Sequence, residues 1–288
     1  GGSYSYGINN YSSIGSVEGT INVDDVSYKG FGIYIQSGAS LNSFSGTINM
    51  KGSSEADAYG ISLGNDISSS YMIGIYNYDK NNSSGVSYDW SKINLSVINT
   101  YDINPYRAYG VYAENTDFGG ANIGGSITAE AKGNAYAFYL GDNGANVGNF
   151  LVSSKLSATT RGDLGSRANT IYAYKSSQIK GKISGEVSIS ASNGNVFGLA
   201  YDNDNNNTPD VINTDNDSVA VYTHWNGNVE TWSSSGIGID FQNIRLNVNA
   251  KNGDAYGIKM DMYANISDAI GGSIIATSSN GTSYGIVN

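Results

Sequence analysis

The sequence predicts an all-β chain that folds as a parallel β-helix, also called a β-solenoid. Three observations favour this class. One short phrase recurs along the chain, a second, alternating phrase recurs between its copies, and no segment shows the sustained 3.6-residue apolar period of a helix. The composition agrees, because 38 Gly and 36 Asn among 288 residues supply many turns, whereas the chain has only 2 Pro.

The first phrase consists of a small or polar residue, an aromatic residue, Gly, and then Ile or Val. Clear copies occupy residues 5–8, 30–33, 58–61, 108–111, 255–258 and 283–286, degenerate copies occupy 135–138, 171–174 and 196–199, and a weak copy occupies 84–86. Most successive copies lie 25 to 28 residues apart. Longer steps of 36 and 59 residues indicate a short insertion after 135–138 and extra residues between 199 and 236.

The second phrase is a short alternating segment that usually follows Gly. Its copies occupy residues 19–23, 46–50, 93–97, 126–131, 187–191, 244–248 and 273–277. Strict alternation is typical of a half-buried strand. A unit of this length cannot bury its apolar face alone, but it can do so when each strand pairs in parallel with the same strand one coil away.

We therefore expect a single domain over residues 1–288, with about ten coils of 25–28 residues and an insertion near 199–236. The Ile, Val and Leu of both phrases would point inward, Gly would relieve crowding between backbones, and the Tyr and Phe would form a ladder along the stack. An antiparallel sandwich or barrel also uses short strands, but it has no reason to repeat one phrase at this period.

The composition excludes several classes of function. Without Cys there is no disulfide framework, thiol nucleophile or thiolate metal site, and His224 is the single His. The net charge of −10 argues against nucleic-acid binding. No apolar run is long enough for a transmembrane segment. The low charged fraction of 14% suits a stack, because equivalent side chains would lie about 4.8 Å apart.

Three segments carry a family resemblance: Ala-Tyr-Gly-Ile at 58–61, Ile-Gly-Gly-Ser-Ile-Thr-Ala at 123–129, and Asn-Gly-Asp-Ala-Tyr-Gly-Ile at 252–258. They resemble the repeats of bacterial autotransporter passengers and of related surface adhesins. The resemblance covers about residues 4–198 and 236–288. It implies a secreted, cell-surface parallel β-helix, often acidic and free of Cys. It implies no catalytic residues, because the repeats of that family share none.

Residues 199–236 depart most from the repeat, and function in solenoids often lies at such departures. Alternating oxygen-bearing side chains there have the spacing with which a loop wraps Ca²⁺. The candidate calcium ligands are Asp202, Asp204, Asn206, Thr208 (through its carbonyl) and Asp210. Asn207 and Asn213 occupy the positions where an EF-hand has Gly and Glu, so the bidentate ligand is missing. The alternative is a solvated polar loop.

The same segment carries Tyr222, Trp225 and Trp232, which we take as candidate ligand- or partner-binding residues. Exposed aromatic faces stack on sugars and on partner surfaces. The alternative is a small satellite core that seals the insertion against the coil. Trp90, just after a strand, is expected to pack inside.

Catalytic patterns are weak. Ser177 and Lys180 have the Ser-x-x-Lys spacing of acylating enzymes, but that motif requires a helix and this segment precedes a strand. Two pairs of carboxylates, at 24–25 and at 215 and 217, are expected to be solvated turns rather than the acid–base pair of a sugar-cleaving enzyme. We therefore predict that the protein is not an enzyme.

The sequence favours an extracellular structural or adhesin-like surface protein, a stalk or filament subunit that presents an acidic surface. The open sheet edges at the ends of a solenoid would favour end-to-end self-association or contact with neighbouring repeats. The alternatives are a carbohydrate- or receptor-binding fibre with a glycan or host-surface partner, and a polysaccharide-cleaving β-helix. No cofactor other than Ca²⁺ is expected.

Overall fold

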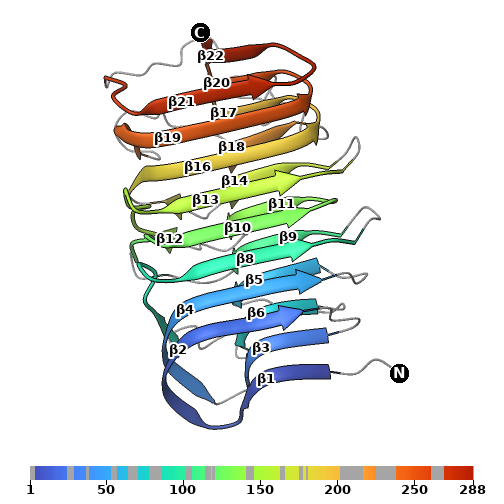
Figure 1. Ribbon diagram of the computed structural model, residues 1–288. Coiled ribbons are helices and arrows are strands. Elements are labelled where there is room, and N and C mark those ends of the chain that lie inside the picture. The colour runs from blue at the N-terminus through green and yellow to red at the C-terminus, as the bar shows by residue number, and fades with distance from the viewer. Residues whose placement is uncertain are drawn as a thin grey trace.

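The computed structural model confirms the predicted class: it is a parallel β-solenoid whose strands pile into one elongated stack, with the two ends of the chain at opposite ends of the stack (Figure 1). No helix occurs among the residues that the structure describes. The described residues are 4–24, 29–36, 39–52, 57–63, 71–77, 86–101, 106–113, 118, 121–140, 146–162, 166–174, 178–179, 181–201, 217–224, 238–260 and 269–287.

Two long sheets face each other across the core. Sheet A has 11 strands in the order β1 (Tyr4–Asn10), β3 (Lys29–Ile35), β6 (Tyr71–Asn77), β5 (Asp57–Leu63), β9 (Ala108–Ala113), β11 (Ala135–Leu140), β14 (Ala168–Tyr174), β18 (Ser218–His224), β17 (Val196–Tyr201), β20 (Ala255–Met260) and β22 (Ser283–Val287). Sheet B runs in chain order through β2 (Ser13–Asp24), β4 (Ser40–Gly52), β8 (Asn94–Asn99), β10 (Ser126–Ala131), β13 (Lys155–Thr160), β16 (Lys182–Asn193), β19 (Gly238–Asn252) and β21 (Ser273–Ser278).

Three short strands complete the described structure. β7 (Val86–Tyr88) pairs with the first part of β4. β12 (Asn146–Val147) and β15 (Gln178–Ile179) form a small third sheet beside the middle coils. Near it, Phe150 bridges Ile123 and Ile183, and all three side chains are fully buried. This third strip therefore closes the core between the two long sheets in the middle of the stack.

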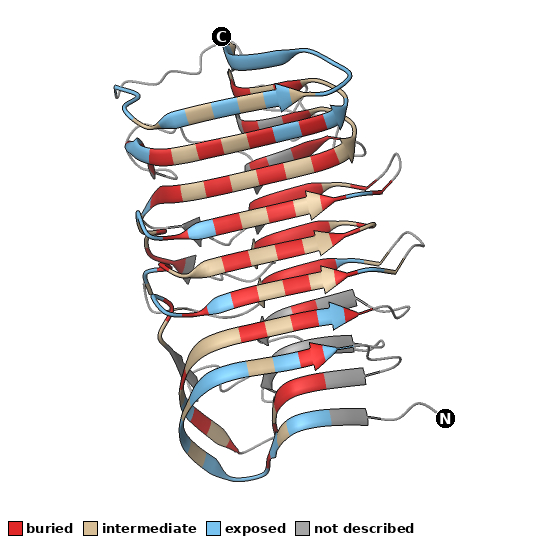
Figure 2. Ribbon diagram, viewed as in Figure 1, coloured by how far each residue is buried: buried red, intermediate tan, exposed pale blue. Residues whose placement is uncertain are grey.

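Sheet B forms because its strands alternate strictly, as the second phrase predicts. In the central strands every second residue is buried, and Figure 2 shows this alternation along the sheet. One column of inward side chains, each at most 2% exposed, consists of Ile48, Leu95, Ile127, Leu156, Val187 and Leu246. Burial of each such side chain contributes about 1.5–3 kcal/mol. The stack is thus stabilised by columns of like residues from successive coils.

Sheet A places its aromatic residues on the outer side of the stack. Tyr109 and Tyr112 belong to an aromatic cluster outside the core, whereas Val111 between them is fully buried in the core. Gly110 also faces inward, because a Cβ there would collide with the Ile127 side chain and with the Ala137 carbonyl oxygen. Because Gly110 and Val111 both face the core, Tyr109 and Tyr112 lie on the same outer face of the sheet although they are three residues apart.

Sheet A departs from chain order at two places. β6 lies between β3 and β5, and β18 lies between β14 and β17. At each place the chain leaves one position in sheet A empty, forms the next strand, and then fills the empty position with the following strand. This adds a strand to sheet A without adding one to the row from β2 to β21 in sheet B. The prediction of about ten coils of 25–28 residues is wrong in its number of coils, because successive copies of the phrase do not always advance by one coil.

The pairing also corrects the register of two predicted copies of the first phrase. The weak copy at 84–86 is wrong, because Val86 begins β7 of sheet B. The copy at 171–174 is displaced, because Asn169 and Ile171 are the partners of Tyr136 and Phe138. A further copy that was not predicted is Ile73-Gly74-Ile75 in β6, which pairs with β3 at the position of the phrase.

The predicted insertion near 199–236 is partly regular structure. Residues 218–224 form β18, which pairs in parallel with both β14 and β17 and therefore belongs to the stack. Asp217, just before β18, is 5% exposed and its Oδ1 accepts a hydrogen bond from the Asn195 backbone N–H at 2.9 Å. The prediction that Asp217 lies in a solvated turn is therefore wrong. Its predicted companion, Asp215, lies outside the described residues.

Candidate functional surfaces

The predicted calcium ligands all lie outside the described residues. This applies to Asp202, Asp204, Asn206, Thr208 and Asp210, which fall in the undescribed range 202–216. The calcium site therefore stays a prediction from the sequence. Within the part of the chain that the structure describes, no group of three or more His, Cys, Asp or Glu could hold a metal ion.

The aromatic candidates have different outcomes. Trp225 and Trp232 lie outside the described residues. Tyr222 lies in β18, where its backbone is in register with Tyr172 of β14. The backbone of Tyr222 therefore belongs to a strand of the stack, and its role as a binding residue stays a prediction. Trp90 is buried, as expected, and its ring packs against Phe118 at 5.3 Å.

Two columns of stacked tyrosines run along the outer side of sheet A. In the first, Tyr109 stacks on Tyr59 and on Tyr136, with ring centroids 4.9 and 5.0 Å apart. In the second, Tyr139 stacks on Tyr112 and on Tyr172 at 4.9 and 5.0 Å. Edge contacts, such as 5.0 Å between Tyr109 and Tyr112, join the columns. Aromatic pairs of this geometry add about 0.5–1.5 kcal/mol each beyond their burial, so the columns lock neighbouring coils together.

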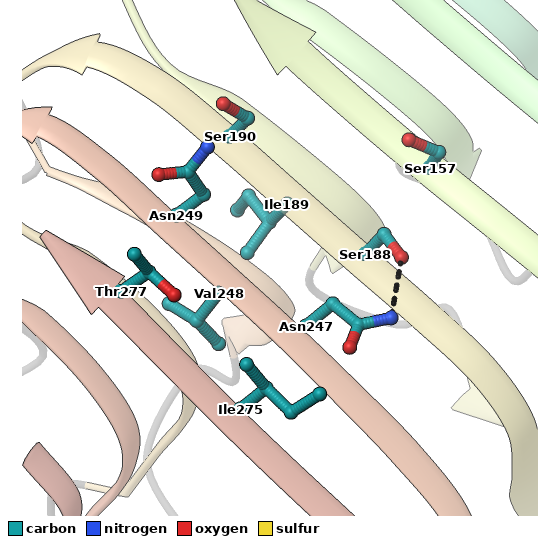
Figure 3. A pocket seen from close by; sticks show the side chains of 9 residues that line it. All are labelled: Ser157, Ser188, Ile189, Ser190, Asn247, Val248, Asn249, Ile275 and Thr277. Carbon is teal, nitrogen blue, oxygen red and sulfur yellow. Dashed lines mark hydrogen bonds between the residues drawn. The ribbon is translucent and has the colours of Figure 1, made fainter.

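The outer face of sheet B carries mainly uncharged polar side chains. A hollow of about 260 Å³ lies on this face across β13, β16, β19 and β21 (Figure 3). Its lining includes the hydroxyls of Ser157, Ser188, Ser190 and Thr277, the amides of Asn247 and Asn249, and the exposed side chain of Ile275. The hollow forms where small Ser side chains of β13 and β16 lie beside longer Asn side chains of β19.

Hydroxyl and amide groups at this hollow can donate and accept hydrogen bonds without charge. Asn247 already donates to Ser188 at 3.2 Å (Figure 3), so the side chains are partly ordered before any ligand binds. This donor and acceptor set suits a neutral polyhydroxylated ligand. These residues were not among the candidates predicted from the sequence, although Ser188, Ser190, Asn247 and Thr277 lie at alternate positions of the second phrase.

Charged residues on this face alternate in sign along the stack. Lys155, Glu186 and Arg245 are register partners on β13, β16 and β19. At the other end of sheet B, Asp24 is the partner of Lys51. Opposite charges at neighbouring positions attract, whereas like charges would repel. These charged side chains are therefore arranged so that register partners in the stack attract rather than repel each other.

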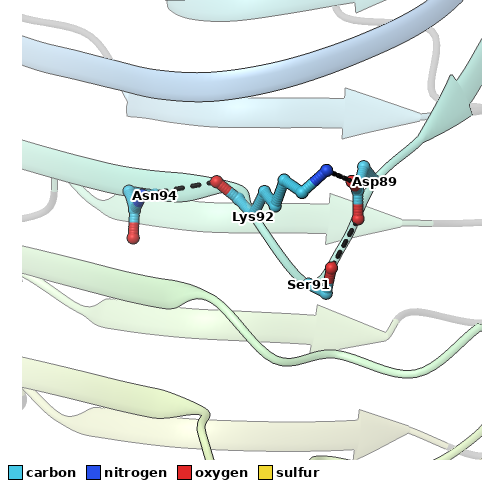
Figure 4. Close-up of polar contacts among 4 residues, drawn as sticks. All are labelled: Asp89, Ser91, Lys92 and Asn94. Atoms are coloured by element: carbon cyan, nitrogen blue, oxygen red, sulfur yellow. Dashed lines mark hydrogen bonds and ion pairs between the residues drawn. The ribbon is translucent and has the colours of Figure 1, made fainter.

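The turn before β8 contains a local charged pair (Figure 4). Ser91 donates a hydrogen bond to Asp89 Oδ1 at 2.6 Å, and Lys92 Nζ lies 2.9 Å from Asp89 Oδ2. The hydrogen bonds from Ser91 and Lys92 lower the pKa of Asp89. Both charged side chains are well exposed to solvent, so the pair contributes little stability and resembles a turn-forming contact rather than a reactive site.

A second carboxylate, Asp240 of β19, accepts hydrogen bonds from Ser184 and Asn243 at 3.0 Å each and from the Gln242 backbone. Burial alone would raise the pKa of Asp240, but these hydrogen bonds outweigh it and the pKa lies below its ordinary value. Asp240 is thus held ionised as a hydrogen-bond acceptor that joins β16 to the start of β19. We assign it a structural role.

Comparison of the chain with protein-family models, with curated proteins and with solved structures gives no significant match. The fold defines the chain as a parallel β-solenoid, and no relative supplies a function for it. None of the described residues belongs to a helix long and apolar enough to cross a membrane.

Proposed function

We propose that the chain is an extracellular structural or adhesin-like protein, a stiff β-solenoid stalk or filament subunit that presents a polar, acidic surface. The observation that carries this proposal is the continuous stack: two long parallel sheets run along its whole length, and the chain ends lie at opposite ends of an elongated body (Figure 1). Such a body is suited to span a distance and to display one face along its length.

Side-chain ladders support a stiff body. Ser43 donates to Ser16 at 2.7 Å and Asn49 donates to Asn22 at 2.8 Å, each between neighbouring strands of sheet B. Together with the stacked tyrosines of sheet A, these contacts repeat the same interaction between successive coils. Bending the stack would strain many equivalent contacts at once.

End-to-end association is part of this proposal. Ile258 of β20 is 2% exposed, whereas Ile286, its register partner on β22, is 49% exposed. The core side chains of the last described strand therefore face solvent at an open sheet edge, which favours pairing with a further strand. We infer that a second copy or a neighbouring repeat covers this edge.

The test of location is antibody labelling of the cells that produce the protein. The proposal predicts labelling of intact cells or of their secreted material. Labelling that occurs only after the cells are broken would contradict it. The oligomer is tested separately by sedimentation of the purified chain: Ile286→Lys should reduce any assemblies, and Thr128→Lys, at an outward position in mid-stack, is the matched control.

The second candidate function is the binding of a neutral glycan, and the hollow on sheet B favours it. Asn247→Ala with Asn249→Ala should abolish binding on a glycan array if the hollow is the site. Loss of binding in Trp225→Ala or Trp232→Ala instead would place the site in the segment predicted from the sequence. Cleavage of the bound glycan would favour the polysaccharide-cleaving alternative. If no glycan binds in any of these assays, the structural role is the only proposed function that remains.

A further inference from the structure

Tyr256 and Tyr284 form a stacked pair near the C-terminal end of sheet A. They are register partners on β20 and β22. Their ring centroids lie 4.8 Å apart and their planes differ by 7°. Tyr284 is 37% exposed and Tyr256 is half-buried, so both rings lie within reach of a soluble oxidant.

Asp254 lies at the phenol of the inner tyrosine. The Tyr256 hydroxyl donates to Asp254 Oδ2 at 3.1 Å, and Asp254 Oδ1 accepts from the Thr282 backbone N–H at 2.8 Å. The second hydrogen bond holds the carboxylate in place between the two strands. A phenol that loses an electron also loses its proton, and a carboxylate at hydrogen-bond distance can accept that proton. The site therefore favours one-electron oxidation of Tyr256.

The composition of the chain indicates that such a pair could serve as a covalent link between coils. The chain has no Cys, so no disulfide can join one coil to the next. A covalent link between coils requires another side chain, and the repeat places tyrosine rings in contact between neighbouring strands.

We propose that Tyr256 and Tyr284 are an oxidative cross-linking site, at which a peroxidase-type oxidant joins the two rings as dityrosine. Each phenol gives up one electron and one proton, and hydrogen peroxide takes up both pairs and leaves as two molecules of water. The two phenoxyl radicals couple through their ortho carbons. The hydrogens on those carbons then move to the oxygens, which restores two phenols joined by one carbon–carbon bond.

The exposure of Tyr284 distinguishes this pair from the other stacked tyrosine pairs of the described residues, in which both rings are buried or half-buried. Tyr109 and Tyr136 stack equally well, but each is only 3% exposed. Tyr11 is 74% exposed, yet it forms no ring contact among the described residues. Tyr256 and Tyr284 combine a ring contact, exposure to solvent and a nearby proton acceptor, Asp254. The link would fasten the last described strand to the stack and prevent its fraying.

The test is treatment of the dilute, folded chain with a peroxidase and hydrogen peroxide, followed by dityrosine fluorescence and mass spectrometry. Cleavage after Lys259 separates the two tyrosines, and fragmentation of the linked peptide pair distinguishes Tyr284 from Tyr263, which lies in the same peptide. We expect this pair in monomeric protein, with a yield independent of protein concentration. Tyr284→Phe and Tyr256→Phe, which keep the rings, should abolish it, and Tyr11→Phe should leave it unchanged.

Asp254→Asn should slow the link while the stack remains, and an unchanged rate would overturn the role of Asp254 as proton acceptor. Absence of the linked pair in the unmodified chain would overturn the site itself. The site would also be overturned if the linked pair persisted in Tyr284→Phe, or if the link formed only between separate molecules. None of these outcomes depends on where the protein is located, so the proposed surface function is tested independently.

Discussion

Gly110 of β9 lies directly against Ile127 of β10, and the contact leaves no space for a side chain at residue 110. The carbonyl oxygen of Ala137, on the neighbouring strand of sheet A, closes the same space at 2.5 Å from where a Cβ would lie. Gly is thus required at residue 110, where sheet A approaches sheet B across the core.

Gly110→Val should therefore destabilise the chain by about 3 kcal/mol, because the new side chain overpacks a fully buried site. Gly285→Val is the matched control. It occupies the equivalent phrase position in β22, where a Cβ would meet nothing within 4 Å, and its cost should stay below about 1 kcal/mol. Urea unfolding followed by circular dichroism measures both. Equal destabilisation by the two variants would contradict the packing described for Gly110.

The tyrosine columns should contribute to stability through their rings rather than their hydroxyls. Tyr136→Ala removes a 3%-exposed ring that stacks on Tyr109, and we expect a loss of about 3 kcal/mol. Tyr136→Phe retains the ring and should cost less than about 1 kcal/mol. Similar losses in the two variants, measured by urea unfolding, would show that the hydroxyl and not the stack is important.

The alternating charges on sheet B predict a salt-dependent effect. Glu186→Lys would place three cations at neighbouring register positions with Lys155 and Arg245, and we expect a loss of about 1 kcal/mol at low ionic strength. Added salt should reduce the loss because it screens exposed charges. Glu186→Gln, the control, should lose less. A loss that does not respond to salt would indicate a packing effect instead.

The phenol of Tyr256 should lose its proton at a higher pH than an ordinary tyrosine. Burial of the ring, followed by the hydrogen bond to Asp254 and the charge of that carboxylate, raises the pKa of Tyr256 to about 12 from an ordinary value of 10.0. Because the folded-state pKa is the higher one, the associated stability is fully present below pH 10.0 and is lost as pH rises through about 12. NMR of labelled tyrosine follows the phenol, and Asp254→Asn should move its midpoint toward 10.0. A midpoint near 10.0 in the unmodified chain would contradict the hydrogen bond.

The fold could be predicted because the signal is repeated. Residues such as Ile48, Leu95 and Ile127 occur at the same position of an alternating phrase, and alternation determines which side of the sheet each residue faces. The aromatic ladder followed from the same periodicity, whereas its position on the outer side of sheet A was not predicted. Local pattern is sufficient for these features because each depends on the strand itself and on its nearest neighbours.

The strand order could not be predicted in this way. β5 and β6 both fit either neighbouring position in sheet A, since Tyr59-Gly60-Ile61 and Ile73-Gly74-Ile75 share the Gly-Ile sequence and pair in register. Which one lies beside β3 depends on the connections between strands rather than on local pattern. The hollow on sheet B was missed for a related reason: Ser188 and Asn247 are unremarkable singly, and only the register of β16 with β19 brings them together.

Electron cryo-microscopy of the purified chain tests the central claim most directly. We expect an elongated particle, single or joined end to end, with a layer spacing of about 4.8 Å along its long axis. A compact particle without this axial spacing would contradict both the parallel stack and the role proposed for it.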